Sequence, residues 1–123
     1  MEIYRLVINE PNEGVYRFGA AKTQKLKKLI LRMSREHGSY THPSPSEDGL
    51  KLTGKHYCGV VGLDGLKEWF GDFLPLLASS KEVYVMKLKT KRPLPLGVES
   101  RNQVVFKWKD VEVLEQKRLK YLV

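Results

Sequence analysis

The sequence predicts a single α+β domain, residues 1–123, in which two helices pack on a mainly antiparallel β-sheet. Three observations predict this class. Short β-branched and aromatic runs alternate with turns, two stretches carry apolar residues at helical spacing, and the strands near the C-terminus follow one another without a helix between them. A chain of 123 residues that is 41% hydrophobic and 29% charged buries one core and folds as one unit.

The N-terminal half opens with a strand followed by a helix. Glu2–Ile8 is rich in β-branched and aromatic residues and ends at the turn-prone NEPNEG, which indicates a strand. A helix is expected from Lys22, with Gly38 as its stop. Its apolar stripe, at positions i, i+3, i+4 and i+7, consists of Leu26, Leu29, Ile30 and Met33.

The middle of the chain predicts a loop, a strand and a second helix. Residues 37–49, HGSYTHPSPSEDG, hold two prolines and two glycines and leave no room for a regular element. Residues 56–62, HYCGVVG, indicate a short buried strand. In LDGLKEWFGDFLPLL the helical spacing returns, with Asp64 as the expected N-cap and Pro75 as the residue that ends or bends the helix.

The C-terminal third predicts strands only. Residues 82–89, EVYVMKLK, alternate strongly, and residues 103–108, QVVFKW, form another strand with Gln103 at its start. Residues 111–114 and the terminal KRLKYLV are expected to supply the remaining edges of the sheet. A side chain at the mouth of a strand is held by rigid backbone and still reaches solvent, so Gln103 is either a working residue or a polar strand start.

The charge balance points to anionic partners. Lys and Arg number 22 against 14 Asp and Glu, which gives a formal charge of +8. Polyanions or acidic protein surfaces are therefore plausible partners, so a host protein or a nucleic acid is expected on the basic surface. The basic residues lie mainly in three stretches, which would form one positive face if the fold joined them: residues 22–35, 87–92 and 117–120.

Several classes of protein and site do not fit the sequence. No apolar run approaches the roughly 18 to 20 residues of a membrane span, and the first residues carry no secretion signal, so a cytoplasmic protein without a membrane partner is expected. Cys58 is the only cysteine, which excludes an internal disulfide and makes a metal site unexpected. The motifs of P-loop and Rossmann nucleotide sites, nucleophile elbows and zinc hydrolases are absent.

Three residues invite a choice between a functional and a structural role. His42 lies in a loop stiffened by Pro43 and Pro45, which is either a site loop or an exposed surface turn. Arg5 lies within an apolar strand, either as an anion clamp that faces a cleft or as an outward residue on a half-exposed strand. Cys58 is expected to be a small buried thiol rather than a nucleophile.

The opening IYR, the later VYVMKL and the run QVVFKWKDVEVLE together resemble the skeleton of the ADP-ribosyltransferase fold. In that family a first-strand Arg or His contacts NAD, and a later strand opens with a catalytic Glu. The matching positions here are Arg5 and Gln103, so glutamine stands where the family has glutamate. GVYRFG, HPSPSEDG, HYCGVVGLDGLKEWF and NQVVFK are similar to small phage and mobile-element proteins associated with this fold.

The resemblance implies NAD as cofactor, held by Arg5, with Tyr40 and His42 along the nicotinamide side. Because the amide of Gln103 cannot stabilise positive charge on the ribose, catalysis would need another carboxylate, such as Glu99 or Asp48. The first expectation is thus transfer of ADP-ribose from NAD to a macromolecule, or binding of an NAD-like nucleotide. The alternative is a non-catalytic basic phage or mobile-element protein that binds and inhibits a host protein or nucleic-acid complex in the host cytoplasm.

Overall fold

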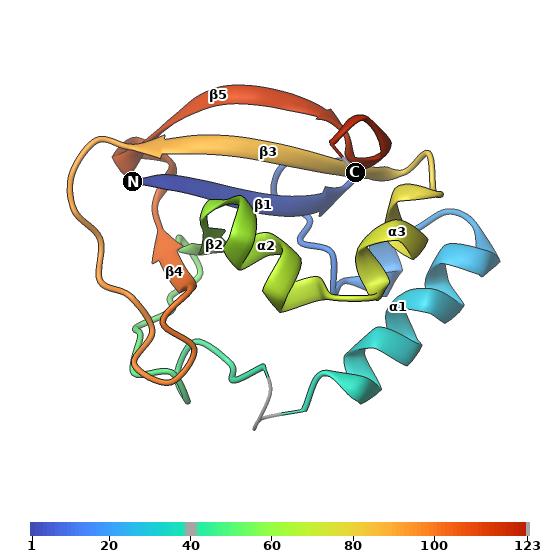
Figure 1. Cartoon of the computed structure of the whole chain (residues 1–123), viewed down its shortest axis with the longest axis horizontal. Coiled ribbons are helices and arrows are strands. Elements are labelled where there is room, and N and C mark those ends of the chain that lie inside the picture. Colours follow the sequence, from blue (N-terminus) through green and yellow to red (C-terminus); the bar gives the residue numbers. More distant parts are fainter. Residues whose placement is uncertain (39–41, 123) are drawn as a thin grey trace.

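The computed structural model describes residues 1–38 and 42–122, which form an α+β domain with one five-stranded sheet and three α-helices (Figure 1). The predicted class and the antiparallel sheet are confirmed. In chain order the strands and α-helices are β1 (Glu2–Ile8), α1 (Gln24–Glu36), β2 (Tyr57–Val61), α2 (Gly62–Phe70), α3 (Phe73–Ala78), β3 (Val83–Thr90), β4 (Gln103–Phe106) and β5 (Val111–Arg118).

The sheet places β1 at its centre. Its order is β4-β2-β1-β3-β5, and every neighbouring pair of strands is antiparallel. Residues 3–8 of β1 are all buried, so both faces of this strand are covered. A polar side chain on β1 therefore has to find its partners inside the protein, which decides the environment of Arg5.

The helices cover one face of the sheet and build the larger core. α1 contributes Leu26, Ile30 and Met33, and these pack with residues of β1, β3, α2 and α3. Leu29 of the predicted stripe lies at the edge of this core. A smaller cluster fills the other face, which explains how both faces of β1 are covered: Ile3, Val7, Met86, Leu88, Val104, Phe106 and Val111.

The second predicted helix is in fact two helices. α2 ends at Gly71, whose φ of 50° lies in the left-handed region that glycine adopts without strain. Pro75 was expected to end or bend the helix, but it lies in the first turn of α3, where its missing N–H costs nothing. The N-cap of α2 is Val61 and not Asp64, which instead places its carboxylate in the first turn near the positive end of the helix dipole.

The C-terminal edge also differs from the expectation. Residues 111–118 form one continuous strand, β5, and a single 3₁₀ turn follows at Leu119–Tyr121. The pairing register between β3 and β5 shifts between Lys87 and Leu88, which marks a bulge. The bulge and the alternating charges interrupt the regular two-residue pattern of a strand. The sequence therefore does not indicate that residues 111–118 form one strand.

The three basic stretches do not all meet on one face. α1 lies beneath α3 at one side of the molecule, whereas the end of β3 that leads into residues 90–92 lies at the opposite side, near the N-terminus (Figure 1). Residues 22–35 and 87–92 are thus apart, whereas residues 117–120 end β5 and lead into the 3₁₀ turn that contacts α3. Within the described ranges, none of the helices has the length and hydrophobicity that a bilayer crossing requires.

A buried carboxylate fixes the start of α1. Thr23 is the N-cap, and its hydroxyl accepts the backbone N–H of Leu26 at 3.3 Å. Glu82 accepts the backbone N–H groups of Lys22 at 2.6 Å and Thr23 at 3.1 Å, and the Thr23 hydroxyl donates to it at 2.9 Å. Burial raises the pKa of Glu82, but these hydrogen bonds and one from Asn9 outweigh it and lower the pKa to about 2.

Candidate functional site

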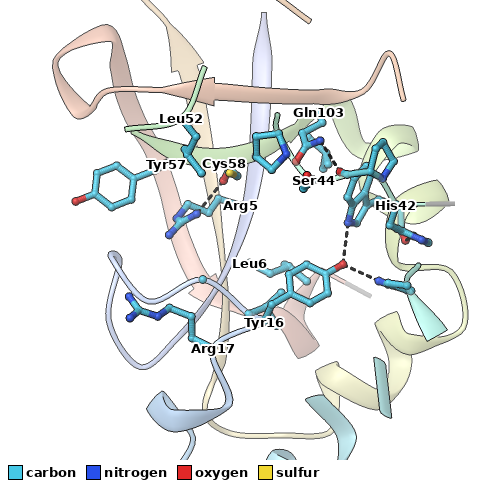
Figure 2. A pocket seen from close by; sticks show the side chains of 18 of the residues that line it. Arg5, Leu6, Tyr16, Arg17, His42, Ser44, Leu52, Tyr57, Cys58 and Gln103 are labelled. Carbon is cyan, nitrogen blue, oxygen red and sulfur yellow. Dashed lines mark hydrogen bonds between the residues drawn. The ribbon is translucent and has the colours of Figure 1, made fainter. Parts of the chain in front are cut away.

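A cavity of about 860 Å³ opens between the sheet and the loops beside it. Its walls come from β1 and β2, the first residue of β4, residues 12–17, the C-terminal end of α1, the loops around residues 42–54 and the end of α2. This volume lies in the range of small-molecule sites. Figure 2 shows Arg5 and Tyr57 toward one end and His42 and Gln103 toward the other, with Tyr16 between them.

Arg5 lies in the wall of this cavity and is only 7% exposed. Its Nε donates to the carbonyl of Pro11 at 3.1 Å, Nη1 to that of Cys58 at 2.8 Å and Nη2 to that of Asn12 at 3.4 Å. The guanidinium group thus ties the loop after β1 to β2. Three of its five N–H groups are used in this way, which leaves two for a further acceptor.

Arg5 forms none of the described ion pairs, although the Glu13 carboxylate is near enough to raise the pKa of its guanidinium. The guanidinium lies 5.3 Å from the centre of the Tyr57 ring. Burial outweighs the effect of Glu13 and lowers the pKa of Arg5, which reflects the cost of keeping a charge away from water. Arg17 lines the same cavity and forms an exposed ion pair with Glu13 at 3.4 Å. Arg5 and Arg17 thus bring two positive charges to this end of the cavity, and Glu13 lies beside them with one negative charge.

Gln103 is the first residue of β4, as predicted, and its side chain is hydrogen-bonded to a second buried carboxylate, that of Asp48. Its Nε2 donates to Oδ2 of Asp48 at 3.0 Å and to the carbonyl of Pro43 at 3.0 Å. Both partners are acceptors, so only an amide or another donor fits this position. A glutamate would place two carboxylates side by side, which explains why glutamine stands here.

Asp48 clamps two loops together and is completely buried. Besides Gln103, its carboxylate accepts the backbone N–H groups of Glu99 at 2.7 Å and Ser100 at 2.9 Å, and the Ser100 hydroxyl. Burial raises the pKa of Asp48, but these hydrogen bonds together hold it below its usual value. A Cβ atom at Gly97 would lie 1.8 Å from Oδ2 of Asp48, so the carboxylate needs glycine there.

The carboxylates proposed for catalysis therefore do not face the cavity. Asp48 lies beneath its wall with its oxygens occupied, and Glu99 contributes a backbone N–H while its exposed side chain lies outside the lining. Among the described residues, Glu47 is the one carboxylate that lines the cavity. Its Oε1 accepts the backbone N–H of Ser44 at 3.1 Å.

The other end of the cavity is built from rings. His42 bonds through Nε2 to the carbonyl of Trp69, and its ring stacks on His37 with 3.5 Å between centroids and 7° between planes. The Trp69 Nε1–H donates to the Tyr16 hydroxyl at 2.9 Å, and that hydroxyl lies 2.6 Å from Nδ1 of His37. The loop around His42 is thus part of the cavity and not an isolated surface turn.

Tyr16 and His37 are both neutral at pH 7. The pKa of Tyr16 is raised by burial, so the hydroxyl keeps its proton and can donate to His37. Burial lowers the pKa of His37 to about 4, and the neighbouring His42 lowers it further than Glu36 raises it. At neutral pH the wall holds a neutral imidazole beside a neutral phenol.

Sequence reasoning missed Tyr16, His37 and Trp69 as parts of this site. Tyr16 reaches the cavity because residues 14–15 fold back along β1, where Val15 N–H donates to the carbonyl of Leu6 at 3.2 Å. Trp69 packs against the larger core and also lines the cavity. Cys58 was expected to be buried, but it is half-buried and lines the cavity, and burial raises the pKa of its thiol. Tyr40 lies outside the described residues.

Comparison with known proteins identifies the family. A model of the family described as "Bacteriophage T4 Y00F protein" matches residues 1–120. The chain belongs to this phage protein family. The expected phage origin is thereby confirmed, and no curated protein and no solved structure matches the chain. The resemblance to the ADP-ribosyltransferase fold stays a prediction.

Proposed function

We propose that this phage-family protein binds a nucleotide-class ligand in the cavity, with an anionic group at the Arg5 end and a ring at the His42 end. The observation that carries the proposal is the buried guanidinium of Arg5, whose described hydrogen bonds go to three carbonyls and which lines a cavity of about 860 Å³. A desolvated charge of this kind gains more from an anion than an exposed one does.

The opposite end suits a planar group. His42, His37, Trp69, Tyr16 and Phe70 present aromatic or imidazole surfaces to the cavity. Aromatic surfaces bind nucleobases through stacking, whichever base is present. A phosphate at one end and a base at the other would match the two ends of the cavity, and NAD, ADP and AMP all have this form.

The proposal includes binding but not transfer of ADP-ribose. Transfer would need a carboxylate close to the ribose to stabilise developing positive charge. Asp48 and Glu99 do not line the cavity, and Gln103 directs its amide nitrogen to Asp48 and Pro43. Glu47 is the described cavity residue that would have to supply that carboxylate.

Calorimetric titration tests the proposal. NAD and ADP are titrated into the wild type, with adenosine as the ligand that lacks phosphate, and we expect micromolar binding of ADP and at least tenfold weaker binding of adenosine. Arg5→Met should remove this difference. Arg35→Met is the matched control, because it removes the same charge from an exposed position on α1 outside the cavity. Absence of heat with every nucleotide in a folded sample would refute the proposal.

The second candidate function is docking on a polyanion through α1. Lys25, Lys28, Arg32 and Arg35 lie on its exposed face, as the sequence predicted, and Glu36 neutralises Arg32 at 2.9 Å. Phosphate-backbone contacts release counterions, so such binding would weaken steeply as salt rises. Duplex DNA titrated at increasing salt should show this slope and lose it in Lys25→Gln/Lys28→Gln, whereas Arg5→Met should leave it unchanged.

A further inference from the structure

The two edges of the sheet differ in how they are covered. At β4 the chain covers its own edge, because Leu96 forms a bridge to Val104. Beside this bridge, the Gly97 N–H donates to the carbonyl of Gln103 at 2.8 Å. β5 forms the opposite edge, along the outer side of β3 (Figure 1). Among the described residues, no further strand, bridge or backbone hydrogen bond covers that outer side. Roughly half of the N–H and C=O groups of β5 therefore face outward, where another strand can pair with them.

The middle of β5 is exposed on both of its faces. Residues 112–116 are all exposed, whereas residues 3–8 of the central strand β1 are all buried. Two apolar side chains lie in this exposed stretch, Val113 at 49% and Leu114 at 43%. Leu114 is the extra residue of the bulge, so no residue of β3 is paired with it. A second strand at this edge would remove from water an apolar surface that the chain itself leaves exposed.

The charged residues of β5 are divided between its two ends. Glu112 and Glu115 come first, and Lys117 and Arg118 follow them. Charges on an edge strand commonly prevent it from pairing with further strands. Here, however, a second copy that runs antiparallel brings its basic end to the acidic end of the first, so opposite charges meet at both ends. A parallel copy would instead place like charges opposite each other.

Two of these four charges are available to a partner strand. Lys117 forms an ion pair with Glu115 of its own strand. Glu112 and Arg118 take part in none of the described ion pairs. Glu112 is exposed and Arg118 is half-buried, and they lie toward opposite ends of β5. Antiparallel pairing therefore brings Glu112 of each copy toward the Arg118 end of the other.

We propose that β5 is a dimerisation edge, at which two copies of the chain pair antiparallel along Val111–Arg118 and join their sheets into one. The self-complementary charges select a second copy as the partner, and Val113 and Leu114 become covered. A contact confined to one strand edge lies at the small end of specific interfaces, so we expect a dissociation constant of about 10 to 100 μM. The described residues that line the cavity include none from β5, so dimerisation and nucleotide binding can fail separately.

Sedimentation equilibrium of the whole chain, without any ligand, tests the dimer. Between about 5 and 500 μM, the apparent mass of the wild type should rise from that of one chain toward that of two. Leu114→Lys should weaken the dimer at least about tenfold with unchanged far-UV circular dichroism, because an ammonium group would have to be covered at the contact. Leu31→Lys is the matched control, since Leu31 is 45% exposed on α1, away from β5. A wild type that stays monomeric throughout, or a Leu31→Lys variant weakened as much as Leu114→Lys, would overturn the proposal.

Charge reversal tests the antiparallel direction of the pairing. Glu112→Lys and Arg118→Glu should each weaken the dimer, because each variant places like charges at both ends of the pair. An equimolar mixture of the two folded variants should restore it, since the first carries basic residues at both ends of β5 and the second acidic ones. If the mixture dimerises no better than either variant alone, or if both variants dimerise as the wild type does, β5 is not the interface.

Discussion

The Asp48 clamp and the Arg5 end of the cavity both bury a charge, but they satisfy it differently. The Asp48 carboxylate receives hydrogen bonds from two backbone N–H groups, a hydroxyl and an amide, and lies fully buried beneath the wall. The Arg5 guanidinium lines the cavity and is bonded to three carbonyls, which leaves two of its five N–H groups for a further acceptor. A saturated charge supports the fold, whereas one with unused donors can also bind a ligand.

The largest expected effect comes from breaking the clamp. Gly97→Ala would place a methyl group 1.8 Å from Oδ2 of Asp48, so the carboxylate would have to leave its donors. We expect a loss of about 3 kcal/mol in the free energy of unfolding, because buried hydrogen bonds to a charge would be broken. Urea denaturation measures it. Gly19→Ala is the control, since nothing lies within 4 Å of the added atom and stability should change little.

Glu82 is a second buried carboxylate that receives several hydrogen bonds, and it extends the comparison between Asp48 and Arg5. The pKa of Glu82 is about 2 in the folded chain, against a usual 4.5, so its contribution to stability is present above pH 4.5 and is lost as the pH falls toward 2. Glu82→Gln should cost about 2 kcal/mol at pH 7. Urea midpoints of the variant and the wild type should then converge as the pH falls, and parallel pH curves would contradict this assignment.

The next effect concerns the identity of residue 103. Gln103→Glu would set a carboxylate against Asp48, where the amide nitrogen now donates at 3.0 Å. We expect a loss of about 1.5 kcal/mol at pH 7, because one of the two carboxyl groups must take up a proton or move away. Stability should recover as the pH is lowered toward 5. If Gln103→Glu were as stable as the wild type at pH 7, the amide would not be required by the clamp.

The smallest change in stability is expected at Arg5, at the end of the cavity where N–H groups are left for a ligand. Arg5→Lys keeps the charge but cannot reproduce the fork that reaches Pro11, Asn12 and Cys58, so we expect a loss of about 1 kcal/mol. Affinity for ADP should nevertheless fall about tenfold, by calorimetry. The opposite ranking, a large loss of stability with unchanged binding, would place Arg5 with the structural charges.

Only some residues of the candidate site could be predicted from the sequence. Arg5 could be singled out because a guanidinium within a strand that is otherwise apolar needs a partner, and His42 because prolines stiffen its loop. The role of Gln103 could not be inferred, because its partner Asp48 lies 55 positions away and no local pattern links them. Tyr16 and His37 carry no local signal either, since they meet only after residues 14–15 fold back along β1.

The sequence by itself determined the α+β class, most of the elements and the exposed basic face of α1, because periodic burial of apolar side chains is a local property of the chain. Tertiary structure alone decided three points: the break at Gly71, the pairing of Asp48 with Gln103, and the stack of His37 on His42. Each depends on groups brought together across the fold or on a backbone angle that packing selects. A buried charge acquires its role from its neighbours, and the fold decides which neighbours it has.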